Sequence, residues 1–150
     1  MRLRGITVLL VEDDADNLEL MAAYFDDEGA RTLGASSTVA ALAITQVAPV
    51  DIVVSDLELL DGNGCDLLRE LRRREGMREL PAIAITGYSE RKWRDHAANC
   101  GFSRYAVKPF SLDQLVDWIA ELSGRAKKED VRASTFAAEL VPGERGRLAR

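Results

Sequence analysis

The fold is decided by residues 6–14, which read ITVLLVEDD. The first six are apolar or β-branched without interruption, and a strand that is apolar at every position is typical of a parallel sheet covered on both faces. The last three are acids that follow the strand directly. Because functional groups of open parallel sheets lie at the carboxyl ends of the strands, we expect these acids to mark a site.

The same pattern, a short strand followed by an amphipathic segment, recurs along the chain. We predict strands at residues 6–11, 31–35, 50–55, 82–86 and 103–107. We predict helices at residues 16–27, 39–47, 65–75, 90–99 and 112–123, where apolar residues recur three and four positions apart. Alternating strands and helices indicate an α/β fold, (βα)5, with a five-stranded parallel sheet, right-handed crossovers and helices on both faces.

Serines and a glycine-rich turn define the expected helix starts. Ser36 or Ser37, Ser89 and Ser111 each precede a predicted helix, where a serine hydroxyl can accept a hydrogen bond from a backbone N–H. Residues 61–64, which read DGNG, predict a turn before the third helix.

Polar groups follow four of the predicted strands. Glu12 and Asp13 follow the first, Asp56 ends the third, Thr86 ends the fourth and Lys108 follows the fifth. In a parallel sheet these groups meet at one edge, where carboxylates within about 4–6 Å repel one another unless a cation intervenes. Mg²⁺, which prefers a few carboxylates together with water and phosphate oxygens, is the simplest candidate.

An aspartate beside a metal, an ammonium and a hydroxyl can accept a phosphoryl group, because a carboxylate is an established nucleophile in phosphoryl transfer. Acids at strand ends have a simpler interpretation as helix N-caps, and Asp14 or Asp16 could have only that role. The coincidence of suitable groups at four strand ends favours a site.

These motifs resemble the receiver domain of two-component signalling. The matching segments are LLVEDD at 9–14, SD at 55–56, ITG at 85–87 and VKPF at 107–110, in order and at the spacing of that family. The resemblance covers residues 5–123 and implies a flavodoxin-like, doubly wound sheet with strand order 2-1-3-4-5. We therefore expect a receiver domain at residues 1–123. Residues 82–88 and 101–102 are most similar to receivers attached to hybrid kinases, although Met1 suggests a stand-alone chain.

The resemblance also implies the roles of the acids. It makes Asp56 the phosphoacceptor and assigns Glu12 and Asp13, together with Asp56, to Mg²⁺. The backbone carbonyl of Glu58 is expected as a further metal ligand.

The remaining site residues are assigned in the same way. Lys108 is expected to contact the phosphate, and Thr86 is expected to turn towards it while Tyr105 changes rotamer as the second part of a switch. Tyr88, with Glu58, occupies a variable position beside the phosphate, where it affects the access of water. Many members of the family have proline where this chain has Leu60, so the loop is expected to be less rigid.

The donor of the phosphate must come from outside the chain. No Gly-x-x-x-x-Gly-Lys-Ser/Thr loop is present, which argues against ATP binding, and the single histidine, His96, has the setting of an exposed helical residue. We expect a histidine kinase or phosphotransfer protein as donor, and catalysis of no reaction beyond the chain's own phosphorylation and dephosphorylation.

The expected readout is a protein contact. A downstream protein is expected to bind the face formed by the fourth helix, fifth strand and fifth helix, where Trp93 either packs on the sheet or contacts the partner. A homodimer through the fourth and fifth helices is an open alternative.

Charge and composition restrict the other partners. Residues 1–123 carry 13 basic and 21 acidic side chains, which argues against binding nucleic acid. No apolar run approaches the roughly 20 residues that span a bilayer, so we expect a cytoplasmic protein. Cys65 and Cys100 lie far apart in sequence, without metal-ligand spacing, and are expected to be reduced thiols.

Residues 124–150 are expected to form a C-terminal extension with a short helix at 129–140 and a disordered tail. The helix could dock a partner or be a frayed end, and the basic excess of 7 over 4 acids is too small to indicate nucleic acid.

Two other functions fit parts of the pattern. A Mg²⁺-dependent phosphatase of the haloacid-dehalogenase type also uses an aspartyl phosphate, but its nucleophile normally follows the first strand. An interaction module that works without phosphorylation would not need the full set of polar residues at the strand ends.

Overall fold

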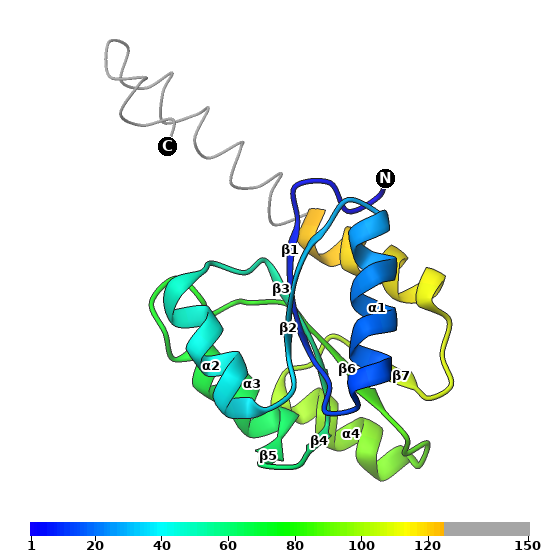
Figure 1. Cartoon of the computed structure of the whole chain (residues 1–150). Coiled ribbons are helices and arrows are strands. Elements are labelled where there is room, and N and C mark those ends of the chain that lie inside the picture. The colour runs from blue at the N-terminus through cyan, green and yellow to red at the C-terminus, as the bar shows by residue number, and fades with distance from the viewer. Residues whose placement is uncertain (125–150) are drawn as a thin grey trace, which may run out of the picture.

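The computed structural model describes residues 1–124, so the predicted helix at 129–140 and the tail lie outside the described residues. Its five parallel strands are β1 (Thr7–Val11), β2 (Arg31–Ala35), β3 (Ile52–Asp56), β6 (Ala82–Thr86) and β7 (Arg104–Val107). They form one sheet in the order β2-β1-β3-β6-β7 (Figure 1). Counting these five strands along the chain, this is the order 2-1-3-4-5, so the predicted flavodoxin-like fold is confirmed.

Five helices connect and cover the strands. They are α1 (Ala15–Asp27), α2 (Thr38–Val47), α3 (Gly64–Arg72), α4 (Arg91–Cys100) and a C-terminal helix at residues 112–124, where the described residues end. None of the helices in residues 1–124 combines the length and apolar character that crossing a bilayer requires.

Side-chain caps at the starts of α2, α3 and the C-terminal helix follow local capping chemistry. The Ser37 hydroxyl accepts from the N–H of Ala40 at 3.0 Å, and the Ser111 hydroxyl accepts from Gln114 at 3.2 Å. Asn63, within the predicted turn, caps α3. The prediction for Ser89 was wrong: Glu90 is the N-cap of α4, and it makes no capping hydrogen bond through its side chain.

The helices lie in two layers, one on each face of the sheet (Figure 1). On one face, Phe25 of α1 and Leu115 and Ile119 of the C-terminal helix pack on apolar residues of the central strands. On the other face, buried residues of α2, α3 and α4, including Leu68 and Ala97, pack against the opposite side of the same strands. The central strands are therefore apolar on both faces because both faces are covered.

The register of the strands brings their carboxyl ends to one level. Val11 pairs with Ser55, Asp56 pairs with Ile85, and Thr86 pairs with Val107. All five residues of β3 are buried, so the backbone that carries Asp56 is held by neighbours on every side. The polar residues at the strand ends consequently share one edge.

The loop after β3 is more ordered than the predicted turn. Glu58–Leu59 (β4) pairs antiparallel with Gly62–Asn63 (β5) in a short hairpin. At its tip the carboxylate of Asp61 accepts from the backbone N–H of Thr38 at 2.9 Å, which ties the hairpin to the start of α2. The backbone N–H groups of Thr38 and Val39 both donate to this carboxylate. These hydrogen bonds, chiefly the one from Thr38, hold the pKa of Asp61 below its ordinary value.

The expectation of two reduced, separate thiols was wrong for this structure. Cys65 at the start of α3 and Cys100 at the end of α4 form a disulfide, with their Cα atoms 5.5 Å apart. The two cysteines are 35 residues apart in sequence, so no local pattern could predict that they pair. They come together because α3 and α4 pack on the same face of the sheet.

Gly64 allows α3 to begin directly behind β3. A Cβ at this position would lie 2.5 Å from the backbone oxygen of Asp56. We expect Gly64→Ala to lower the free energy of unfolding by about 1–3 kcal/mol, the usual cost of overpacking, as measured by urea denaturation. Gly87→Ala is the matched control, because nothing lies within 4 Å of the Cβ it would add. Equal stability of the two variants would show that the close approach has no cost.

Candidate functional site

Three carboxylates converge at the carboxyl edge of the sheet. One oxygen from each of Glu12, Asp13 and Asp56 lies within 4.8 Å of those of the other two. Glu12 and Asp13 follow β1, and Asp56 ends β3, so adjacent strands deliver them. The convergence that the strand ends predicted is present in the structure.

Lys108 reaches the acids from the segment after β7. Its Nζ lies 2.7 Å from Oδ2 of Asp56 and 3.1 Å from Oε2 of Glu12. Partial burial would lower the pKa of Lys108, but the hydrogen bonds and charges of Asp56 and Glu12 outweigh it and raise that pKa. The ammonium therefore stays charged and offsets part of the negative charge.

Glu12 is the most deeply placed of the acids, with 1% of its surface exposed. Its pKa is raised, chiefly because burial disfavours the charged form and further because Asp56 shares a hydrogen bond with it, while Lys108 acts in the opposite direction. Three carboxylates against one ammonium leave an excess of negative charge in this cluster, which is the condition that a bound cation relieves.

Asp14 and Asp16 do not belong to this cluster. The Asp14 side chain accepts from the N–H of Asn17 at 3.0 Å and caps α1. Asp16 is exposed in the first turn of the same helix, where a negative side chain is favourable. For these two acids the simpler interpretation as helix-terminal residues therefore suffices.

The two residues predicted to form the switch lie on neighbouring strands. Thr86 is buried at the end of β6, and its hydroxyl accepts from the N–H of Tyr88 at 3.2 Å. Tyr105 on β7 donates its hydroxyl proton to the carbonyl of Tyr88 at 2.5 Å. Both side chains thus hold the same loop between β6 and α4.

Glu58 and Tyr88 contact each other beside Asp56. The backbone N–H of Glu58 donates to Oδ1 of Asp56 at 3.2 Å, and the Tyr88 hydroxyl donates to the Glu58 carboxylate at 2.9 Å. This bond is the main reason that the pKa of Tyr88 is raised. Trp93 stacks on Tyr88 with ring centroids 4.9 Å apart. No local pattern could have revealed the pair, whose members are 30 residues apart.

These groups surround an open pocket of about 480 Å³. Its polar lining residues are Asp13, Asp56, Lys108, Thr86, Tyr88 and Glu58. Leu60, where a proline is common in the resembling family, projects from the rim with 91% of its surface exposed. The pocket is large enough for a small charged group to approach Asp56.

The donor set fits a hard divalent cation. The acidic cluster supplies carboxylate oxygens, the ligands that Mg²⁺ prefers, and leaves room on the pocket side for water or phosphate oxygens. The arrangement can therefore hold a cation beside a carboxylate nucleophile, with an ammonium already hydrogen-bonded to that nucleophile.

Comparisons with known proteins agree with this geometry. The family of response regulator receiver domains matches residues 8–120. An uncharacterized 14.6 kDa protein of Leptolyngbya boryana is 31% identical over 114 residues, which cover 76% of this chain and 87% of that protein. Response regulator SaeR of Staphylococcus aureus is 30% identical over 121 residues, which cover 81% of this chain but only 52% of SaeR.

Solved structures show the same fold. A CheY-like response regulator receiver domain protein from Methanospirillum hungatei superimposes with a TM-score of 0.75 at 24% identity, covering 85% of this chain and 98% of that one. The family matches most of the described residues, and both the sheet order and the acids at the strand ends agree with that match. This chain belongs to the response regulator receiver domain family of two-component signalling.

Proposed function

We propose that this receiver takes a phosphoryl group onto Asp56 from a phosphohistidine of a partner kinase or phosphotransfer protein. The observation that carries the proposal is the position of the Asp56 carboxylate, which lies at the pocket with Lys108 at 2.7 Å and the acids Glu12 and Asp13 beside it. A carboxylate with a fixed cation on one side and an open approach on the other is suited to attack a phosphoryl group.

In this reaction an oxygen of Asp56 forms a bond to phosphorus while the phosphorus–nitrogen bond of the donor histidine breaks. The electron pair of the broken bond stays with the imidazole nitrogen. Lys108 offsets charge on the transferred group, and the N–H of Glu58 keeps the Asp56 carboxylate oriented. The Thr86 hydroxyl lines the same pocket and can donate to a phosphoryl oxygen.

Glu12, Asp13, Asp56 and the backbone carbonyl of Glu58 are the groups that would hold Mg²⁺. When bound, the ion supplies positive charge to the phosphoryl oxygens and relieves the repulsion among the acids. The chain turns over only its own phosphoryl group and acts on no further substrate.

We also propose how phosphorylation is read. Thr86 and Tyr105 both hold the loop that contains Tyr88, so a phosphate that draws the Thr86 hydroxyl would change this loop and the start of α4. A downstream protein, or a second copy of the chain, would then bind α4, β7 and the C-terminal helix. The proposed function involves neither nucleic acid nor a membrane, and we propose a cytoplasmic location for the phosphotransfer.

The two alternative functions have less support. The aspartate follows β3, the third strand, and not the first strand as in haloacid-dehalogenase phosphatases. A phosphorylation-independent module would not require Lys108, Glu12 and Asp56 to form a compact hydrogen-bonded group.

Mg²⁺ should stabilise the protein by binding the acids of the folded state. At a concentration ten times its Kd we expect about 1.4 kcal/mol of added stability, seen as a rise in Tm by calorimetry. The double variant Glu12→Gln/Asp13→Asn should lose this rise, whereas Asp16→Asn, which removes an exposed acid outside the cluster, should keep it. A rise that persists undiminished in the double variant would exclude the acids as the binding site.

Asp56 should be the position that becomes labelled. Acetyl phosphate with Mg²⁺ is expected to add one phosphoryl group to the wild-type chain by intact mass, and Asp56→Asn should abolish the addition because an amide is a poor nucleophile. Asp66→Asn, an exposed acid on α3, is the matched control and should be labelled normally. An unlabelled wild type, or a labelled Asp56→Asn, would refute the proposal.

The hydrogen bond between Tyr88 and Glu58 should slow hydrolysis of the phosphoaspartate, because both residues line the pocket through which water must approach. We expect Tyr88→Phe to shorten the phosphoaspartate lifetime by about two- to tenfold, the equivalent of one net hydrogen bond. The decay of label in isolated phosphoprotein measures this. Tyr24→Phe, on α1, serves as control, and equal lifetimes of all three proteins would rule out the role of the bond.

A further inference from the structure

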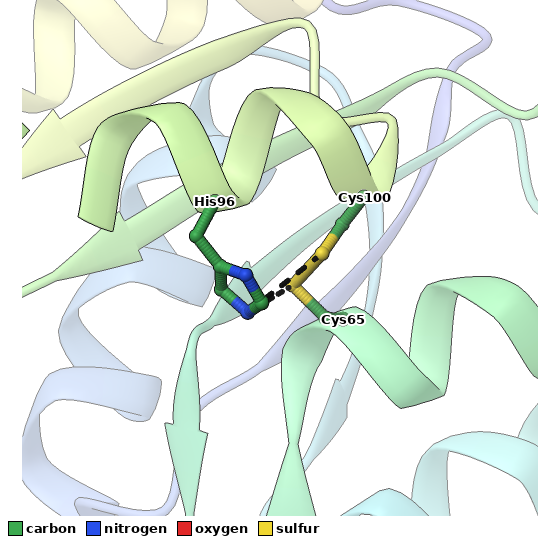
Figure 2. Close-up of side chains that lie close together, drawn as sticks. All are labelled: Cys65, His96 and Cys100. Atoms are coloured by element: carbon green, nitrogen blue, oxygen red, sulfur yellow. Dashed lines mark hydrogen bonds between the residues drawn. A yellow bond between two sulfur atoms is a disulfide. The ribbon is translucent and has the colours of Figure 1, made fainter. Parts of the chain in front are cut away.

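Cys65, His96 and Cys100 form a second cluster, and none of the three lines the acidic pocket (Figure 2). The two sulfurs are joined as a disulfide, and the imidazole of His96 points at them, with Nε2 3.5 Å from Sγ of Cys65 and 3.9 Å from Sγ of Cys100. His96 and Cys100 lie one turn apart on α4, and Cys65 lies at the start of α3.

The position of His96 matches a third ligand of a thiolate metal site. In tetrahedral zinc sites with Zn–S near 2.3 Å and Zn–N near 2.0–2.1 Å, the nitrogen–sulfur separation is about 3.6 Å. Both nitrogen–sulfur distances in the cluster are already close to that value. Only the sulfur–sulfur separation must grow, to about 3.8 Å, and rotation about the Cα–Cβ bonds of the cysteines can supply this.

Burial supports the same interpretation. Cys65 and Cys100 are 3% and 9% exposed, whereas His96 is exposed on the surface of α4. The sulfurs would therefore lie beneath a bound ion, and the imidazole would lie at the solvent side. Such a site offers three protein ligands and leaves one position for water, the pattern of an open zinc site.

We propose that Cys65, His96 and Cys100 bind a thiophilic divalent cation such as Zn²⁺ when the cysteines are reduced, and that the disulfide is the oxidised, metal-free form of this site. Two electrons and two protons from a dithiol reductant open the S–S bond, and the reductant becomes a disulfide. Metal binding then displaces the two thiol protons. The third ligand distinguishes this proposal from a purely structural disulfide, which requires no imidazole.

The metal site neither uses nor requires phosphorylation of Asp56. It joins α3 to α4, and the His96 ring makes a T-shaped contact with the ring of Trp93, which stacks on Tyr88 of the acidic pocket. A metal ion on His96 would therefore lie one aromatic contact away from Trp93, whose fluorescence can report binding.

The test is metal binding by the whole chain under anaerobic conditions. A phosphine reductant, which is itself oxidised to the phosphine oxide, opens the disulfide without adding competing thiols, and saturating Mg²⁺ occupies the acidic pocket. Zn²⁺ is then titrated against a chromogenic chelator, and Co²⁺ is used in parallel to detect thiolate-to-cobalt charge-transfer absorption. We expect one equivalent of either metal on the reduced chain and none at this site on the oxidised chain.

Variants identify the ligands. Cys65→Ser or Cys100→Ser should weaken Zn²⁺ binding at least about 100-fold, since loss of groups outside the ligand sphere alone costs 10–100-fold, and should remove the charge-transfer band. His96→Ala, at an exposed position of α4, should weaken binding at least about tenfold. Asn99→Ala, exposed on the same helix, should bind as wild type. A reduced chain that takes up no metal, or equal binding by His96→Ala and Asn99→Ala, would overturn the proposal and leave a redox disulfide only.

Discussion

The structure depends on how one ammonium is placed among three carboxylates. Lys108 lies within hydrogen-bonding distance of both Asp56 and Glu12, in a cluster where burial already raises the pKa of Glu12. The acids converge because parallel strands end at one level, so the fold itself creates the repulsion. Repulsion among the acids makes this edge less stable than an apolar edge would be, and the same excess of negative charge favours a bound cation.

The rest of the sheet keeps this cluster rigid. β3 is buried along its whole length between β1 and β6, and α3 begins so close behind it that Gly64 has no room for a side chain. Asp56 therefore has little freedom except at its carboxylate, which the N–H of Glu58 and Lys108 orient from two sides. Support of this kind fixes the direction in which the Asp56 carboxylate points.

The loop after Thr86 and α4, which follows it, bury fewer apolar side chains than β3 and its neighbours do. The loop after Thr86 is fixed by the hydroxyls of Thr86 and Tyr105, and α4 buries only Ala97 and Cys100. A row of rings runs from Tyr88, in the loop before α4, through Trp93 to His96 on α4, where the imidazole contacts the disulfide. One helix therefore carries residues that contact both the acidic pocket and the cysteine cluster.

The sequence alone determined the α/β class, the strand order through its family resemblance, and the acids that meet at the sheet edge. These follow from local patterns: uninterrupted apolar runs, helical spacing and the residue after each strand. The tertiary structure alone decided which side chains from distant elements touch. The Cys65–Cys100 pair, the hydrogen bond from Tyr88 to Glu58 and the hydrogen bond from Thr38 to Asp61 each join segments more than 20 residues apart. Such contacts depend on how helices and loops pack over the sheet, and short-range periodicity carries no information about that packing.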